Sequence, residues 1–241
     1  VPENIPAGVP SVEAGKASYE AIITAGKLAL NDEISAITTA PINKKSLHLA
    51  GYPFPGHTEL LGHLTNSPQV ALMMAGNSMR VVLATTHVPL EQVKSHITQE
   101  RIQKTIHLTH EWLTQHVTAV PNIAVTGLNP HCGDGGIFGQ EENEHILPAL
   151  KAAQTEGIQA SGPFSADSLF SRSGIEKYDA VICMYHDQGM IPIKMDSAGQ
   201  GVNITLGLPI LRTSVDHGTA FDIVGKNKAC AENLKMALRT A

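Results

Sequence analysis

Apolar residues recur along this chain with two alternating periods, one typical of helices and one typical of buried strands. Stretches with apolar residues every three or four positions predict helices over about 11–31, 98–116 and 141–155, a short one after Gly56, and a last one from about Ala231. Short apolar runs predict strands from Ile34, over 71–76, 80–87 and 122–128, and near Ala180, Ile191, Val202 and Leu211. Residues 41–46 are typical of a loop. Helices that alternate with strands indicate an α/β protein with a parallel or mixed sheet covered by helices.

The chain shows no internal repeat, low-complexity tract or linker, so we expect residues 1–241 to form one α/β unit. A length of 241 residues is enough to bury a substantial core. Any division into two lobes must be made by strands that cross between them, and the sequence does not mark that boundary.

Charge and cysteine usage exclude several classes of partner. Charged residues make up 16% of the chain and the net charge is −5, so we expect no basic surface for nucleic acid or an anionic membrane. Cys132, Cys183 and Cys230 are odd in number and lack CxxC spacing, which argues against a disulfide framework and a thiolate zinc site. No apolar run reaches the roughly 18 residues of a membrane span, and the opening residues lack signal-peptide features. We therefore expect a cytoplasmic protein.

Three predicted strands each carry a histidine at or just past the carboxyl end. They are RVVLATTH ending at His87, NIAVTGLNPH ending at His131, and DAVICMYH ending at His186. Any one such histidine among the chain's 12 is more often just a polar residue leaving the sheet. All three, however, share one structural position, and ligands of open α/β sheets bind at the carboxyl ends of the strands. Three neutral imidazoles can hold a catalytic divalent metal, so the sequence predicts a metal-dependent enzyme.

The last third of the chain supplies candidate anion ligands. Lys194, Asn203 and Arg212 are evenly spaced at or near predicted strand ends. A lysine offers a point charge, an arginine a planar fork and an asparagine a neutral donor, a set suited to a carboxylate or a phosphate. Singly, each is more often a solvated surface residue. The glycine-rich segment 127–139 fits neither the Walker loop nor the dinucleotide fingerprint, and its glycines serve either a ligand's close approach or a tight loop around His131.

Six ordered strings make the chain resemble a known family. They are TAPINK from Thr39, PGHTE from Pro55, ATTHVPL from Ala84, GLNPHCGDGG from Gly127, MYHDQG from Met184 and GVNITLGLPILRTSVDHGTAFDI from Gly201. Through them the chain closely resembles the 4-hydroxythreonine-4-phosphate dehydrogenases of pyridoxal phosphate biosynthesis, over essentially its whole length. That family opens with a strand and a GDPAGIGPE-like segment, which this sequence lacks, so we expect a member without its first portion.

The resemblance implies the fold, the assembly and most of the site. The fold would be similar to the isocitrate and isopropylmalate dehydrogenases, one α/β catalytic unit with mixed sheets covered by helices and two lobes around a cleft. Family members are homodimers that share the active site between subunits. The implied residues are His87, His131 and His186 for the metal; His57, Thr58, Lys194, Asn203 and Arg212 for the substrate; and His217, Gly218 and Thr219 for NAD or NADP. Beside these we assign to catalysis Lys194 and Asp187, which follows His186 and has a loop cap as its alternative role.

The implied chemistry suits these residues. A divalent metal, zinc, magnesium or cobalt, would activate the secondary hydroxyl of 4-phosphohydroxy-L-threonine while hydride passes to the nicotinamide. The β-keto acid would then lose carbon dioxide to give 3-amino-2-oxopropyl phosphate. Asp187 would orient the metal ligands or relay a proton. Two alternatives stay open: dehydrogenation of a related acid, either threonate or erythronate 4-phosphate or an aromatic cis-dihydrodiol carboxylate, and hydrolysis at a three-histidine zinc site.

Overall fold

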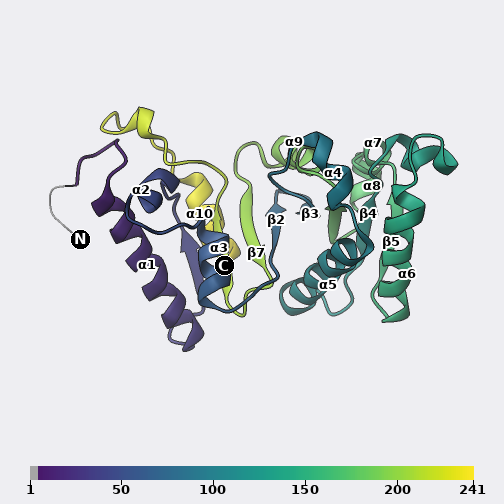
Figure 1. The fold of residues 1–241 in the computed structure, drawn as a ribbon, viewed down its shortest axis with the longest axis horizontal. Coiled ribbons are helices and arrows are strands. Elements are labelled where there is room, and N and C mark those ends of the chain that lie inside the picture. The colour runs from purple at the N-terminus through teal and green to yellow at the C-terminus, as the bar shows by residue number, and fades with distance from the viewer. Residues whose placement is uncertain (1–4) are drawn as a thin grey trace. The chain divides into compact units, whose positions relative to one another are not determined.

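The computed structural model describes residues 5–241, which divide into two compact units (Figure 1). The first unit combines the described residues up to Val70 with Val202–Ala241, and the second is the continuous segment Ala71–Gly201. Residues 1–4 lie outside the described residues. The expected unit 1–241 and the search for a signal peptide both begin with them.

The first unit is a mixed sheet of three strands with helices packed on it. β1 (Ala36–Thr39) runs parallel to β8 (Leu211–Val215), and β8 runs antiparallel to β7 (Val202–Leu206). The helices are α1 (Val12–Leu30), α2 (Lys44–Leu49), α3 (His57–Leu64) and α10 (Glu232–Thr240), with a 3-10 turn at Phe221–Ile223. A core that includes Ile22, Ile37 and Leu61 joins α1, β1 and α3, which fixes the start of α3 against the sheet.

The second unit is a mixed sheet of five strands in the order β2, β3, β6, β4, β5. β2 is antiparallel to β3, and the other neighbours are parallel. The strands are β2 (Ala71–Ala75), β3 (Arg80–Leu83), β4 (Ile123–Thr126), β5 (Ala160–Phe164) and β6 (Ala180–Cys183). The helices are α4 (Leu90–His96), α5 (Gln99–His116), α6 (Leu147–Thr155), α7 (Ala166–Leu169), α8 (Arg172–Ile175) and α9 (His186–Ser197), with a 3-10 turn at Pro130–Gly136 and a π turn at Glu142–Ile146.

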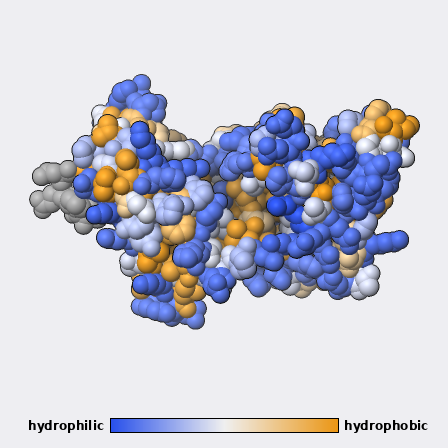
Figure 2. All heavy atoms as spheres, in the orientation of Figure 1, coloured by the Kyte–Doolittle hydropathy of each residue, from blue (hydrophilic) through white to orange (hydrophobic). Residues whose placement is uncertain are grey.

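Helices cover both faces of the second sheet. Val81 of β3 and Val181 of β6 share a buried cluster with Met190 and Ile193 of α9. Successive strand residues point to opposite faces, so the residues next to Val81 in β3 and next to Val181 in β6 face the other side of the sheet. There α5 contacts β3, β4 and β6. On the side seen in Figure 2, hydrophilic residues cover the outer surface of α5.

The long helices begin where their capping residues predict. Ser11 precedes α1, and its hydroxyl accepts a hydrogen bond from the backbone N–H of Ala14 at 3.1 Å. Thr98 precedes α5 and caps Arg101 in the same way at 3.2 Å. The predictions of helices over 11–31 and 98–116 are confirmed, and so is the mixed α/β fold class.

The strand predicted near Ile191 is wrong, because residues 186–197 form helix α9. The apolar run 190–193 is short enough to fit either period, and its burial follows the helical one. Met190 and Ile193 are buried, whereas Ile191 between them is 60% exposed. Lys194 consequently lies within a helix and not near a strand end.

Further elements differ from the sequence prediction. The predicted loop 41–46 contains the start of α2, which is capped by Asn43 through a 2.9 Å hydrogen bond from the Ser46 N–H. Helices α4, α7 and α8 and strand β5 have no counterpart in the prediction. The β5 sequence, ASGPF, contains a glycine and a proline, two residues that are uncommon inside strands.

Two observations bear on the cellular setting. Within residues 5–241, no helix is both long and apolar enough to cross a membrane. Cys132, Cys183 and Cys230 are all free thiols, and Cys183 is buried in the second sheet.

The packing of α1 on α2 depends on the absence of a side chain at Gly15. A Cβ at this position would lie 2.0 Å from the Ser46 carbonyl oxygen and 2.9 Å from the Ala50 Cβ. We expect Gly15→Ala to lower the free energy of unfolding in urea by about 1–3 kcal/mol through overpacking, although alanine favours a helix by about 1 kcal/mol. The neighbouring exposed variant Lys16→Ala should change it by less than about 0.5 kcal/mol. A Gly15→Ala protein as stable as the wild type would contradict this close contact.

Candidate functional site

His87 and His186 lie together at the carboxyl edge of the second unit's sheet. β3 and β6 are adjacent and parallel, so the segments that follow them leave the sheet on the same side. His87 follows the end of β3, and His186 is the first residue of α9, just after β6. Their ring centroids are 5.7 Å apart, with 42° between the ring planes. At this separation both imidazoles can contact one bound ion.

The carboxylate of Asp187 lies beside the His186 ring. His186 Nδ1 and Asp187 Oδ1 are 2.7 Å apart. A carboxylate that accepts the Nδ1 proton fixes the tautomer whose Nε2 is available to bind a metal. The donor chemistry of His87 and His186 therefore suits a divalent metal ion that takes its other ligands from elsewhere.

His131 lies on the loop after β4, the other parallel neighbour of β6. From His131 to Gly135 the backbone is left-handed, with φ between 43° and 79°, a conformation unfavourable for residues other than glycine. The buried Glu142 carboxylate holds the base of this loop, because its Oε1 accepts from the N–H groups of Leu128 at 2.8 Å and Asn129 at 2.7 Å.

The third histidine is separate from the other two within one chain. Among residues 5–241, no group of three or more His, Cys, Asp or Glu side chains is close enough to hold a metal ion. The structure thus brings His87 and His186 together, and it does not bring His131 into the same group.

In the first unit, Arg212 is a buried cation held by two hydroxyl groups. It is 3% exposed, and its guanidinium donates to Thr39 Oγ1 at 2.7 Å and Thr205 Oγ1 at 3.1 Å. Burial lowers the pKa of Arg212 to about 10, against the opposing effect of Glu59, so the group stays charged at pH 7. Its Nε has no hydrogen-bond partner within residues 5–241. A buried charge with a donor to spare favours an anionic ligand.

Asn203 shares a sheet face with Arg212. It lies opposite Ser214 in the antiparallel pair of β7 and β8. Because alternate strand residues share a face, the side chains of Asn203 and Arg212 emerge on the same side. The buried Oδ1 of Asn203 also has no hydrogen-bond partner in the described part of the chain. This face therefore offers one donor and one acceptor to a ligand.

His57 adds a neutral imidazole to the same region. It is the first residue of α3, and half-buried Thr58 follows it in the same turn. Burial, with a smaller contribution from the positive charge of Arg212, lowers the pKa of His57 to about 3. The ring is therefore uncharged at pH 7 and can both donate and accept a hydrogen bond.

The remaining predicted residues lie on two separate elements. Lys194 is an exposed residue of α9, the helix that His186 begins. His217, Gly218 and Thr219 lie on the segment after β8 in the first unit, where His217 Nδ1 is 2.9 Å from the Gly218 carbonyl oxygen. No described atom lies within 4 Å of a Cβ placed on Gly218, so this backbone has open space beside it.

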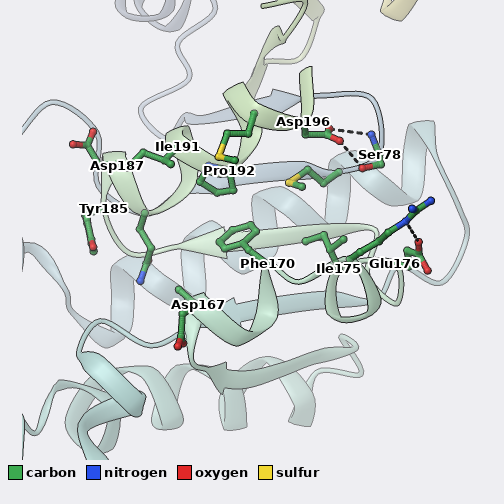
Figure 3. Close-up of a pocket in the computed structure, with 15 residues that line it drawn as sticks. Ser78, Asp167, Phe170, Ile175, Glu176, Tyr185, Asp187, Ile191, Pro192 and Asp196 are labelled. Atoms are coloured by element: carbon green, nitrogen blue, oxygen red, sulfur yellow. Dashed lines mark hydrogen bonds and ion pairs between the residues drawn. The ribbon is translucent and has the colours of Figure 1, made fainter. Parts of the chain in front are cut away.

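A cavity of about 760 Å³ lies along α9 in the second unit (Figure 3). Tyr185 and Asp187 lie at one end, and Phe170, Ile191 and Met195 contribute apolar walls. Sequence reasoning missed this cavity because its lining comes from three separate segments, 78–79, 166–176 and 185–196. The one available signal was the apolar run of α9, which was interpreted as a strand.

The chain is similar to a well-defined group of proteins. A family model described as pyridoxal phosphate biosynthetic protein PdxA matches residues 1–241. The 4-hydroxythreonine-4-phosphate dehydrogenase of Geobacter metallireducens is 51% identical over 234 residues, which are 97% of this chain and 69% of that protein. The D-threonate 4-phosphate dehydrogenase of Cupriavidus necator is 46% identical over 240 residues, which are 99% of this chain and 72% of that protein. The crystal structure of 4-hydroxythreonine-4-phosphate dehydrogenase from Klebsiella pneumoniae matches with a TM-score of 0.93 and 41% identity, covering 99% of this chain and 73% of that one.

The lowered pKa of His57 makes stability depend on pH. Below pH 6.5 the unfolded chain binds a proton at His57 that the folded protein does not bind until about pH 3, so acid favours unfolding. We expect the wild type to lose about 2 kcal/mol more stability than His57→Gln between pH 7 and pH 5. Urea unfolding at both pH values measures the difference. His48→Gln, at an exposed site on α2, should keep the wild-type pH dependence, and equal pH dependence of wild type and His57→Gln would contradict a buried neutral ring.

Proposed function

The chain belongs to the family of the pyridoxal phosphate biosynthetic protein PdxA, and on this premise we propose that it is a 4-hydroxythreonine-4-phosphate dehydrogenase. It would oxidise the secondary alcohol of 4-phosphohydroxy-L-threonine with NAD or NADP, and the β-keto acid would lose carbon dioxide to give 3-amino-2-oxopropyl phosphate. The observation that carries this proposal is the buried Arg212, which keeps its charge and a spare donor for an anionic substrate.

Arg212, Asn203, His57 and Thr58 would bind the substrate. The guanidinium of Arg212 would hold a phosphate or carboxylate oxygen, because Thr39 and Thr205 only partly satisfy it. The neutral His57 can donate to an oxygen or accept from a hydroxyl without adding charge. Asn203 would accept a hydrogen bond from the substrate's amino group through Oδ1. Lys194 would supply a second positive charge for the carboxylate or phosphate.

His87, His131 and His186 would hold a divalent ion, zinc, magnesium or cobalt. When bound, such an ion lowers the pKa of a coordinated alcohol and polarises a ketone. Asp187 would keep the His186 ring in the tautomer that exposes Nε2, through the 2.7 Å contact at Nδ1. As an exposed carboxylate it would also pass a proton between the site and solvent.

His217, Gly218 and Thr219 would contact the nicotinamide cofactor, which accepts the hydride. Their support is the family resemblance together with the open space beside the Gly218 backbone. The free thiols Cys132, Cys183 and Cys230 suit a reducing compartment, and we place the enzyme in the cytoplasm.

A second candidate substrate is D-threonate 4-phosphate. The observation that favours it is the relative from Cupriavidus necator, which carries that name and is 46% identical over 99% of this chain. The two acids share a carboxylate, a secondary alcohol and a phosphate, and they differ in an amino or a hydroxyl group at C2. Asn203 Oδ1 can accept a hydrogen bond from either group, so only measured turnover separates them.

We further propose a homodimer with an active site shared between subunits. Four exposed apolar side chains lie close in sequence to the histidines. Ile137 and Phe138, on the loop after His131, are 75% and 52% exposed, and Ile191 and Met195 on α9 are 60% and 79% exposed. Apolar groups gathered on a surface mark protein contacts. A second copy of the chain that covers them would bury the surroundings of all three histidines.

The reaction is tested by absorbance at 340 nm with NAD or NADP, a divalent metal and each phosphorylated acid. We expect metal-dependent formation of NADH or NADPH, measured both for this chain and for the chain preceded by the family's opening segment. His131→Ala should abolish metal binding and turnover at unchanged unfolding temperature, because it removes one ligand. His116→Ala, at an exposed site on α5, should keep both metal binding and turnover.

Three results would overturn these assignments. Tight stoichiometric metal in His131→Ala would exclude that residue as a ligand. If the folded, metal-loaded dimer forms no NADH or NADPH with either acid, that result would contradict the dehydrogenase. Breakdown of either acid without any nicotinamide cofactor would favour a zinc hydrolase instead.

The dimer is tested by a charge placed on α9. Met195→Glu would bury a carboxylate in the proposed interface, so we expect the dimer dissociation constant to rise by roughly 100-fold or more. Sedimentation equilibrium measures that constant. Val120→Glu, at a 61% exposed site on the turn before β4, is the control and should dimerise as the wild type does. Unchanged association of Met195→Glu would exclude this face of α9 from the interface.

A further inference from the structure

One side chain, Gln188, connects the two strand ends that lead to His131 and His186. It is half-buried in the first turn of α9. Its Oε1 accepts from the Met184 N–H at 2.7 Å and from the Thr126 hydroxyl at 2.8 Å. Its Nε2 donates to the Gly127 carbonyl oxygen at 2.8 Å. Met184 precedes His186 by two residues and Gly127 precedes His131 by four, so one amide spans the bases of both segments.

The contacts of Gln188 allow only one orientation of its amide. The N–H of Met184 can only donate and the carbonyl of Gly127 can only accept. A reversed amide would place NH2 against the N–H and oxygen against the carbonyl. A glutamate of the same length keeps the acceptor but lacks the donor, and a methionine lacks both. The position therefore requires an acceptor and a donor on one planar group.

The same network includes the segment that leads to His87. The hydroxyl of Thr85 donates to the Met184 carbonyl oxygen at 2.7 Å, two residues before His87. The regular strand pairing of β3 with β6 ends nearby, at the hydrogen bond from the Ala84 N–H to the Cys183 carbonyl at 2.8 Å. Beyond that point these side chains connect the segments. Both the backbone N–H and the backbone carbonyl of Met184 take part.

We propose that Gln188 is a positioning residue for metal binding. It acts through the histidines, by fixing the positions of the two segments from which His131 and His186 project. The inference rests on the proposed function, because it takes these histidines to be metal ligands. Groups that orient metal ligands typically change affinity by about 10–100-fold when they are removed.

Zinc binding to the full chain tests the proposal. We expect Gln188→Met to bind Zn²⁺ about 10–100-fold more weakly than the wild type in calorimetric titration. Gln188→Glu should also bind more weakly, because its second carboxylate oxygen would face the Gly127 carbonyl. Gln154→Met is the matched control. It removes a glutamine hydrogen bond of 2.7 Å to the Ala160 carbonyl, away from the histidines, and should bind zinc as the wild type does.

Amide hydrogen exchange of the metal-free protein supplies a second readout. The Met184 N–H should exchange faster in Gln188→Met than in the wild type and stay protected in Gln154→Met. Faster exchange with wild-type zinc affinity in both Gln188 variants would overturn the positioning role and leave Gln188 a structural residue. If His186→Ala binds zinc as tightly as the wild type does, that result would instead overturn the proposed metal site, and the inference with it. If Gln188→Met does not fold, the zinc affinity of the isosteric Gln188→Glu decides.

Discussion

The parallel pairing of β6 with both β3 and β4 is the constraint on which the second unit's site depends. The register places Val82 beside Ile182 and Ala124 beside Val181, so the three strands end at one edge of the sheet. Each strand is largely buried on both faces and mostly apolar, which leaves most polar side chains to the segments beyond the strand ends. Chemistry at this edge is therefore a product of strand pairing.

The first unit prepares its binding groups in a different way. Arg212 is buried in the sheet, where its guanidinium donates hydrogen bonds to two threonine hydroxyls. A carboxylate in their place would have satisfied the guanidinium and removed its demand for an anion. Hydroxyls hold the side chain in position without neutralising its charge, and Glu59 interacts with that charge only as a smaller effect than burial. The lowered pKa of His57 has burial as its larger cause, and the positive charge of Arg212 adds to the effect because a second cation beside it is unfavourable.

The sequence was sufficient to predict site residues where they lie at the ends of clearly patterned strands. Histidines at the ends of buried strands were predicted from the apolar runs alone, because strand length and burial fix where such a run stops. Lys194 shows the limit: a four-residue apolar run fits a strand as well as a helix, and only packing against β3 and β6 decides. Thr39 contacts Arg212 from 173 positions away in the chain, and nothing local in the sequence indicates that pairing. Gln188 stood within the MYHDQG string, but its partners on another strand were not readable from sequence.

The division of the chain also governs how it is assembled. β1 pairs with β8, so Ala36 pairs with Leu211 although the whole second unit lies between them in the sequence. The strand pairs of the second unit are all formed within Ala71–Gly201. Long-range pairing is slow to form, because loop closure must come before the contacts that compensate for it. On a ribosome, we therefore expect the unit that carries His87, His131 and His186 to be complete first, while the unit that carries Arg212 waits for residues 202–241 to emerge.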